Sequence, residues 1–98
     1  MPQARDWQQV QTDLRHDWDA TILGARRPWT EVQDDIHFGW SQAMRAEFRG
    51  AKFEDVESEL QALWEQRVPH ARYEDWRSVR EAVRTGFGRG QQELDIAA

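Results

Sequence analysis

The stretch WTEVQDDIHFGWSQA, residues 29–43, contains the pattern that decides the fold. Counted from Trp29, Val32 lies at +3, Ile36 at +7 and Trp40 at +11. At about 100° per residue these four positions fall on one narrow face of an α-helix. A β-strand would instead place apolar residues at every second position, and this stretch does not. It is therefore predicted to form an amphipathic helix.

The same spacing of an aromatic residue, Val, an aliphatic residue and a second aromatic residue occurs in three further segments, which begin at Trp7, Phe53 and Trp76. The four segments predict four helices whose apolar faces form the core, with six tryptophans supplying much of its area. The predicted core residues are Trp7, Val10, Leu14, Trp18, Trp29, Val32, Ile36, Trp40, Phe53, Val56, Leu60, Trp64, Trp76, Val79, Val83 and Phe87.

Residues that interrupt helices separate the four segments. Gly24, Gly50 and Pro69 lie in the three connections. Glycine is common just past a helix end, and proline cannot continue a helix. At the start of the chain Asp6 and Gln9 fit a capping box. Short connections make successive helices antiparallel neighbours. The predicted helices lie near residues 6–22, 29–48, 53–67 and 73–88.

Two glycines inside predicted helices indicate how the helices meet. Gly39 and Gly86 both lie at +10, each directly before an aromatic residue, in the second and fourth segments only. An interior glycine costs a helix about 1 kcal/mol relative to alanine, so the matching positions favour a packing role. We expect the second and fourth helices to approach closely there, or a tryptophan to cover the bare backbone. A helix kink is the alternative.

The matched glycines also indicate an internal duplication. Trp76 follows Trp29 by 47 residues, and Phe53 follows Trp7 by 46. The predicted fold is all-α, a four-helix bundle made of two duplicated antiparallel helical hairpins in a single domain, residues 1–98. Its predicted parts are repeat 1 (about 6–48), repeat 2 (about 53–88) and a flexible tail (89–98).

Three stretches are similar to known sequences: WxxVxxxIxxGWxxA in residues 29–43, FRGAKFEDVESELQALWE in residues 48–65, and VREAVRTGF in residues 79–87. With this pattern the chain resembles uncharacterised bacterial proteins built from a paired-helix repeat, some of them loosely associated with stress responses. The resemblance covers nearly the whole chain except the tail. It implies a duplicated hairpin and a bacterial origin, and it supplies no catalytic residue.

Composition and charge exclude several classes of protein. The chain has no cysteine, which excludes disulfides and thiolate metal sites. Its net charge of −5 argues against direct nucleic-acid binding, which normally needs a basic surface. No apolar run approaches the roughly 20 residues of a membrane span, and the first residues lack the apolar region of a signal peptide. We expect a cytoplasmic protein that binds neither nucleic acid nor membranes.

Neither a metal site nor a catalytic site is predicted. His16 and His37 each follow an aspartate by three residues, a spacing that can bind metal in a helical bundle. The two histidines lie at different positions of the repeat, and the later segments contain no matching aspartate–histidine pair. We therefore expect ordinary surface histidines. His70 lies beside Pro69 in a connection between helices. No serine has a histidine beside it, and GFGRG, residues 86–90, follows a helix instead of a strand. The chain is predicted to be no enzyme and to hold no cofactor.

Arg77, Arg80 and Arg84 line one side of the fourth predicted helix. They predict either a phosphate or partner site, or charge pairs with the third helix, each worth about 0–1 kcal/mol. Antiparallel packing favours the pairs. The facing acidic residues are Glu54, Glu57 and Glu65. An aromatic ligand pocket among the tryptophans is a further alternative, although their regular recurrence favours core packing.

Phe38 is the predicted centre of a protein interface. It lies about 180° around its helix from the apolar face, so an isolated bundle would expose it. A two-fold homodimer would pack Phe38 of each copy centrally, where aromatic anchors contribute most. Asp34 and Asp35 would then meet Arg45 of the other copy at the rim, and Phe48 adds apolar surface to the same helix.

The resulting functional hypothesis is a small, acidic, non-enzymatic helical protein that acts as a protein-interaction or stress-associated module. Two alternatives stay open. One is a small-ligand-binding module that uses the aromatic core or the arginine flank. The other is an acidic protein that occupies the nucleic-acid-binding surfaces of other proteins.

Overall fold

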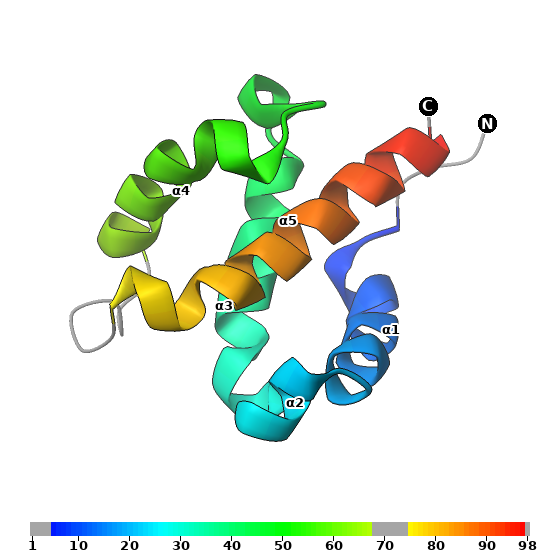
Figure 1. The fold of residues 1–98 in the computed structure, drawn as a ribbon. Coiled ribbons are helices and arrows are strands. Elements are labelled where there is room, and N and C mark those ends of the chain that lie inside the picture. The colour runs from blue at the N-terminus through cyan, green and yellow to red at the C-terminus, as the bar shows by residue number, and fades with distance from the viewer. Residues whose placement is uncertain (1–4, 68–74, 98) are drawn as a thin grey trace.

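The computed structural model describes residues 5–67 and 75–97, and this part of the chain is helical without a strand (Figure 1). The predicted all-α class is therefore confirmed, with a long helix at each of the four segments of the sequence pattern. The helices are α1 (Trp7–Asp19), α2 (Ile22–Arg26), α3 (Trp29–Ala43), the 3-10 helix η1 (Ala46–Phe48), α4 (Phe53–Arg67) and α5 (Trp76–Ala97). The sequence pattern does not predict the short helices α2 and η1. Pro69 and His70 lie outside the described residues.

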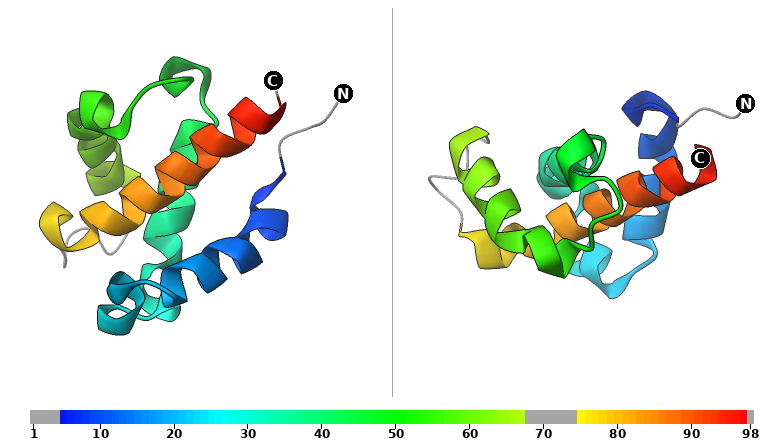
Figure 2. Two further views of the ribbon diagram at one scale, coloured as in Figure 1. Left: turned by 45° about the vertical axis from the view of Figure 1, so that its right-hand side comes forward. Right: turned by 90° about the horizontal axis from the view of Figure 1, so that it is seen from above.

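The four long helices form two hairpins that cross. α1 leads through α2 into α3, and α4 precedes α5 (Figure 1). α5 lies across α3, while α1 and α4 lie on opposite sides of this pair (Figures 1 and 2). Within the described chain the contact between α3 and α5 is the most extensive between any two helices. This crossing is the main junction of the two hairpins.

Gly39 and Gly86 lie at the crossing, where the two backbones touch. A Cβ atom on Gly39 would overlap the carbonyl oxygen of Val83 and lie 2.9 Å from the backbone nitrogen of Phe87. A Cβ atom on Gly86 would overlap the carbonyl oxygen of Ile36. Only glycine lets two backbones approach this closely. The backbone of the opposite helix, and no tryptophan, therefore covers each glycine, which confirms the predicted close approach.

The contacts at the crossing are reciprocal. Ile36 and Val83 both occupy +7 of their segments, and each presents its carbonyl oxygen to the glycine of the other helix. One turn further along, a Cβ atom on Gly90 would lie 2.6 Å from the Cβ atom of Ala43 and 3.0 Å from the carbonyl oxygen of Trp40. Small residues on both helices thus extend the close approach by another turn.

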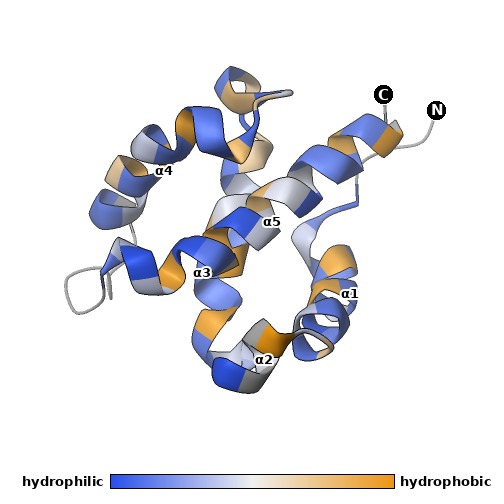
Figure 3. Cartoon of the chain, in the orientation of Figure 1, coloured by the Kyte–Doolittle hydropathy of each residue, from blue (hydrophilic) through white to orange (hydrophobic). Residues whose placement is uncertain are grey.

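Two apolar clusters fill the hairpins, one on each side of the crossing. The first lies between α1 and α3, with one residue of α5, and consists of Val10, Leu14, Trp18, Trp29, Val32, Ile36, Trp40 and Ala82. The second lies between α4, α5, η1 and the far side of α3 and consists of Phe38, Ala43, Phe48, Phe53, Leu60, Trp64, Trp76, Val79, Val83 and Phe87. Of the predicted core residues, only Trp7 and Val56 are partly exposed. Figure 3 shows apolar and polar residues interleaved along each long helix, as amphipathic helices require.

α3 is shorter than predicted, because the chain turns after Ala43. Arg45 adopts an extended conformation, and η1 follows it. This turn directs Phe48 into the second cluster, where it is buried. Gly50 then adopts a φ of 75°, a left-handed conformation that favours glycine, before α4 begins.

The predicted flexible tail, residues 89–98, is wrong for the part that the structure describes, because α5 continues to Ala97. Glu93 is 2% exposed and accepts hydrogen bonds from Arg5 at 2.6 and 3.3 Å. Gln91 donates a hydrogen bond to the carbonyl oxygen of Phe48 at 2.6 Å. These contacts tie the last turns of α5 to the start of the chain and to η1.

Candidate functional site

The structure buries Phe38, the predicted centre of an interface. Its side chain is 9% exposed and belongs to the second cluster, with residues of α4 and α5. The physical reason is that α3 packs on several sides at once. α1 covers its main apolar face, α5 crosses it, and α4 also contacts it. The prediction of an exposed Phe38 is wrong, and Phe48 is buried beside the same helices.

The charged residues predicted to form the rim of that interface have other positions. Asp35 is 0% exposed and accepts a hydrogen bond from the indole nitrogen of Trp64 at 2.8 Å. Asp34 is exposed, whereas Arg45 forms an ion pair with Glu47 at 2.6 Å. The structural argument for a homodimer centred on α3 is therefore lost.

Two of the three arginines that flank α5 form charge pairs with α4, and Arg77 is exposed. Arg80 donates to both carboxylate oxygens of Glu57, the longer contact being 3.0 Å. Arg84 pairs with Glu54 at 2.6 Å. Hydrogen bonding by Arg80 lowers the pKa of Glu57. Arg80 and Arg84 thus stabilise the α4–α5 hairpin, as the charge-pair alternative predicted.

The described histidines lie apart. His16 is exposed near the end of α1. His37 stacks on Trp7, with ring centroids 4.3 Å apart, and burial lowers the pKa of His37. Among residues 5–67 and 75–97, no group of three or more histidine or acidic side chains could hold a metal ion. His70 lies outside this part of the chain.

The tryptophans pack on one another. The ring centroid of Trp7 lies 6.3 Å from that of Trp29 and 5.8 Å from that of Trp40. Trp64 meets Trp76 edge-on, with centroids 5.6 Å apart. Their rings pack within or against the two apolar clusters. This favours the core-packing alternative over an aromatic ligand pocket.

A groove of about 590 Å³ lies between α4 and η1. Apolar side chains form its floor, with Phe48 from η1 and with Val56, Ala62 and Leu63 from α4. Val56 and Leu63 lie seven residues apart and therefore share one side of α4. Both are partly buried and contact the second cluster. The groove is an exposed edge of the apolar core, and we call it the α4 groove.

Acidic side chains border the α4 groove. Glu47 and Glu59 line it beside the apolar floor. α4 carries a single basic residue, Arg67, among its five acidic residues Glu54, Asp55, Glu57, Glu59 and Glu65. Asp55 and Glu59 form no ion pair with any other described residue, so their charges are not neutralised within this part of the molecule. Because Glu47 is paired with Arg45, Glu59 is the carboxylate of the lining that adds a negative charge beside the apolar surface.

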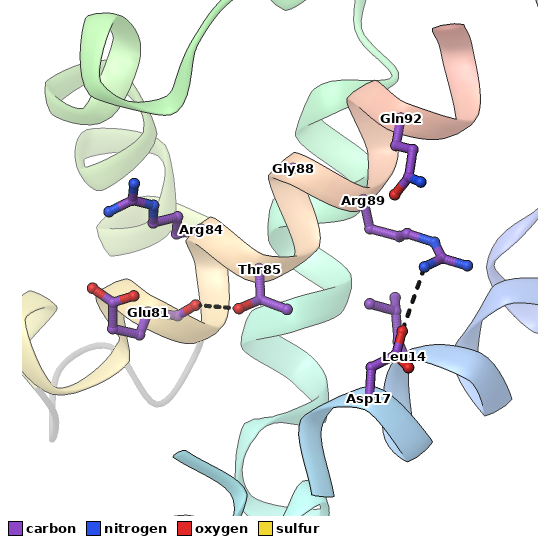
Figure 4. Close-up of a pocket in the computed structure, with 8 residues that line it drawn as sticks. All are labelled: Leu14, Asp17, Glu81, Arg84, Thr85, Gly88, Arg89 and Gln92. Carbon is purple, nitrogen blue, oxygen red and sulfur yellow. Dashed lines mark hydrogen bonds and ion pairs between the residues drawn. The ribbon is translucent and has the colours of Figure 1, made fainter. Parts of the chain in front are cut away.

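A hollow of about 360 Å³ lies between α1 and α5 (Figure 4). Leu14 and Asp17 line it from α1, and Thr85 and Arg89 from α5. Two contacts lie within this lining: Arg89 lies 3.5 Å from Asp17, and the Thr85 hydroxyl donates to the carbonyl oxygen of Glu81 at 2.8 Å. The contacts of Arg89 with Asp13 and Asp17 therefore link α1 to α5 beside this hollow.

Sequence reasoning missed the α4 groove. It placed Val56 in the core and Phe48 at a dimer interface, and it assigned no role to Leu63. One signal was present in the sequence, because Leu63 lies at +10, where the first segment has Asp17 and the second has Gly39. An apolar residue at a position that is polar or bare elsewhere indicates a wider apolar face on α4.

Comparison with protein families, with curated proteins and with solved structures finds no match to this chain. Within the described residues, no helix combines the length and the apolar character that crossing a membrane requires.

Proposed function

We propose that this protein is a non-enzymatic interaction module of the cytoplasm whose docking surface is the α4 groove. The proposal rests on one observation, the apolar floor bordered by acidic side chains. Helix-binding grooves take the apolar anchors of an amphipathic segment on such a floor. Charged rims select the partner and orient it. The partner is accordingly an amphipathic segment with basic residues beside its apolar face.

The arrangement of side chains on α4 suits such a segment. Val56 and Leu63 provide a contact two turns long, which matches anchors spaced at i, i+3 or i+4 and i+7 on a partner helix. Glu59 lies between them in the sequence and can meet a lysine or arginine of the partner without giving up an ion pair to another described residue. A protein that covers nucleic-acid-binding surfaces would use the acidic residues alone, so the apolar floor favours helix binding.

The reciprocal contacts of Gly39 and Gly86 support a further part of the proposal, that the two hairpins are copies of one ancestral unit. In this view the copies diverged at +10 of their first helices, which carry Asp17 in one and Leu63 in the other. That divergence would give the docking surface to the second hairpin only. A bacterial origin and a stress-associated role, both implied by the resemblance, stay predictions.

Binding of labelled model peptides tests the proposed function. An amphipathic peptide of leucine and lysine is expected to bind the protein in fluorescence anisotropy, and a leucine–glutamate peptide of equal length is not. Leu63→Glu should weaken binding about tenfold or more, because it places a charge on the floor of the groove. Glu59→Lys should also weaken binding, through the exposed rim and without touching the core.

Ile22→Glu is the matched control, because Ile22 is an apolar side chain on α2 that is 71% exposed. This variant should bind the basic peptide as the parent protein does, and circular dichroism should show the parent's helix content in every variant. Equal binding of the two peptides, or an equal loss of binding in Ile22→Glu, would contradict the proposed docking surface.

A further inference from the structure

A groove of about 390 Å³ between α1 and α3, here called the α1–α3 groove, has a different chemical character. Polar side chains surround one tryptophan, and the lining residues are Gln11, Thr12, Arg15, Trp29, Thr30 and Gln33. Arg15 lies 3.9 Å from Asp19, its ion-pair partner among the described residues. The side chains of the glutamines and threonines form no hydrogen bond within the described chain. The groove therefore gathers hydrogen-bonding groups that remain available.

The other hairpin shows what occupies the corresponding place. The corresponding positions of the two hairpins are Gln11 and Glu57, Gln33 and Arg80, and Trp29 and Trp76. In the α4–α5 hairpin the carboxylate of Glu57 accepts a hydrogen bond from the indole nitrogen of Trp76 at 2.9 Å and another from Arg80 at 3.0 Å. A carboxylate thus bridges the two helices next to a tryptophan.

No side chain provides that carboxylate in the α1–α3 hairpin. Gln11 is neutral, and the indole N–H of Trp29 has no hydrogen-bond partner among the described residues. It is not a buried orphan, because among the described indole nitrogens the one buried without a partner is that of Trp40. Arg15 stands where the other hairpin has Gln61, so a cation is present in place of an amide. The lining of the groove therefore has donors and no carboxylate, and within the described chain Arg15 has only the exposed Asp19 as a partner, at 3.9 Å.

The first turn of α3 adds backbone donors to the same place. Its N-cap is Pro28, which makes no capping hydrogen bond through its side chain. α1 is capped by Asp6, and Asp75 accepts a hydrogen bond from the backbone of Ser78 at the start of α5. Uncapped N–H groups and the helix dipole attract anions, and Thr30 of the groove belongs to this turn.

We propose that the α1–α3 groove binds a small hydroxylated organic carboxylate. Its carboxylate takes the place that Glu57 has in the other hairpin, between the indole N–H of Trp29 and the guanidinium of Arg15. The hydroxyl groups of the ligand bond with Thr12 and Thr30. The site lies on the hairpin that does not carry the α4 groove, so it is a function separate from peptide binding.

Titration followed by the tryptophan indole signals in ¹H–¹⁵N spectra tests this site, with Trp29→Phe assigning the signal of Trp29. Gluconate and lactate are the carboxylate probes, and glucitol and glycerol are their uncharged counterparts. The Trp29 indole signal should shift saturably with at least one carboxylate and with neither polyol. Arg15→Gln, which introduces the residue type of the other hairpin, should weaken binding about tenfold or more. The exposed Arg49→Gln has the same change of charge elsewhere and should bind as the parent protein does.

Gln11→Glu provides a second test that needs no ligand. It supplies a carboxylate at the position of Glu57, so it should shift the Trp29 indole signal without any probe and abolish the response to gluconate and lactate. The proposal is overturned if neither carboxylate gives a saturable shift, if the polyols bind equally well, or if Arg15→Gln binds as tightly as the parent protein.

Discussion

At the scale of single residues, Asp35 and Phe38 depart most from the expectation for an exposed helix face. Both are buried against the second hairpin, with Asp35 bonded to an indole of α4 and Phe38 within the second cluster. The corresponding residues of α5 are Ala82 and Thr85. Because a repeat pattern contains only what the two hairpins share, it cannot predict an asymmetric contact of this kind.

Replacing Trp64 by phenylalanine removes the indole donor from the buried carboxyl group of Asp35. Loss of a hydrogen bond to such a group costs about 1–3 kcal/mol, so the free energy of unfolding measured with urea should fall by about that amount. Trp76→Phe is the matched control, because Glu57 is 26% exposed and keeps its bonds to Arg80. The control should lose clearly less stability. Equal losses would show that the hydrogen bond to buried Asp35 contributes no more to stability than the hydrogen bond to the partly exposed Glu57.

At the scale of elements, the length of α5 illustrates how tertiary contacts override local preference. Three glycines lie between residues 86 and 90, and such a composition predicts a frayed end. The helix nevertheless continues, because Glu93 is bonded to Arg5 and lies 3.5 Å from Arg89. Arg5 also pairs with Asp13 of α1 at 3.0 Å. Helices in proteins owe most of their stability to such packing contacts.

The ion pairs at the end of α5 predict a dependence of stability on pH. Hydrogen bonding by Arg5 lowers the pKa of Glu93 below its ordinary value of 4.5. Folding therefore favours the ionised form, so this contribution is complete above the ordinary pKa and is lost as the pH falls through the lowered value. The free energy of unfolding should thus decrease on acidification below about pH 4.5.

Urea titrations of the parent protein and of Glu93→Gln at neutral and acidic pH measure this effect. The variant should be less stable at neutral pH and should lose less stability on acidification. Glu31→Gln, which changes an exposed side chain of α3, should follow the parent protein. Parallel pH profiles for the parent and Glu93→Gln would contradict a role for this carboxylate.

The sequence predicted the helix faces that follow from the spacing of apolar residues. It missed the burial of residues that contact a further helix, distant in the sequence. Trp40 and Val83 could be assigned to the core, because spacing alone defines a helix face. Gly39 could be assigned to a close approach, because its cost needs a compensating contact. Phe38 and Glu93 could not be placed, since their burial depends on helices far along the chain. The sequence offered no reason for an apolar residue at Leu63, because the other side of its groove is formed by η1, which the sequence did not predict.

At the scale of the whole molecule, the crossing of α3 and α5 joins two hairpins whose apolar clusters share residues, because Ala82 of α5 belongs to the first cluster and Phe38 and Ala43 of α3 belong to the second. The glycines let the crossing helices touch through their backbones, which leaves α1 and α4 on the outer sides (Figure 2). Each outer helix therefore borders a different groove, one apolar and acidic on α4, the other polar and cationic on α1. The shared crossing thus supports two unlike surfaces.

A comparison of the stability of two single variants, Gly86→Ala and Gly88→Ala, tests the crossing most directly. A Cβ atom on Gly86 would overlap the carbonyl oxygen of Ile36, whereas a Cβ atom on Gly88 would have no neighbour within 4 Å. Overpacking at Gly86 should lower the free energy of unfolding by about 1–3 kcal/mol or more. At Gly88, alanine should raise it by about 0.5–1 kcal/mol through helix propensity.

Gly39→Ala should behave as Gly86→Ala does, because the two contacts are reciprocal. Urea unfolding of the three variants under one set of conditions is the decisive measurement. The crossing predicts a loss of stability at Gly39 and Gly86 and a gain at Gly88. A gain of stability at all three positions would contradict it, since the backbones of α3 and α5 would then not touch.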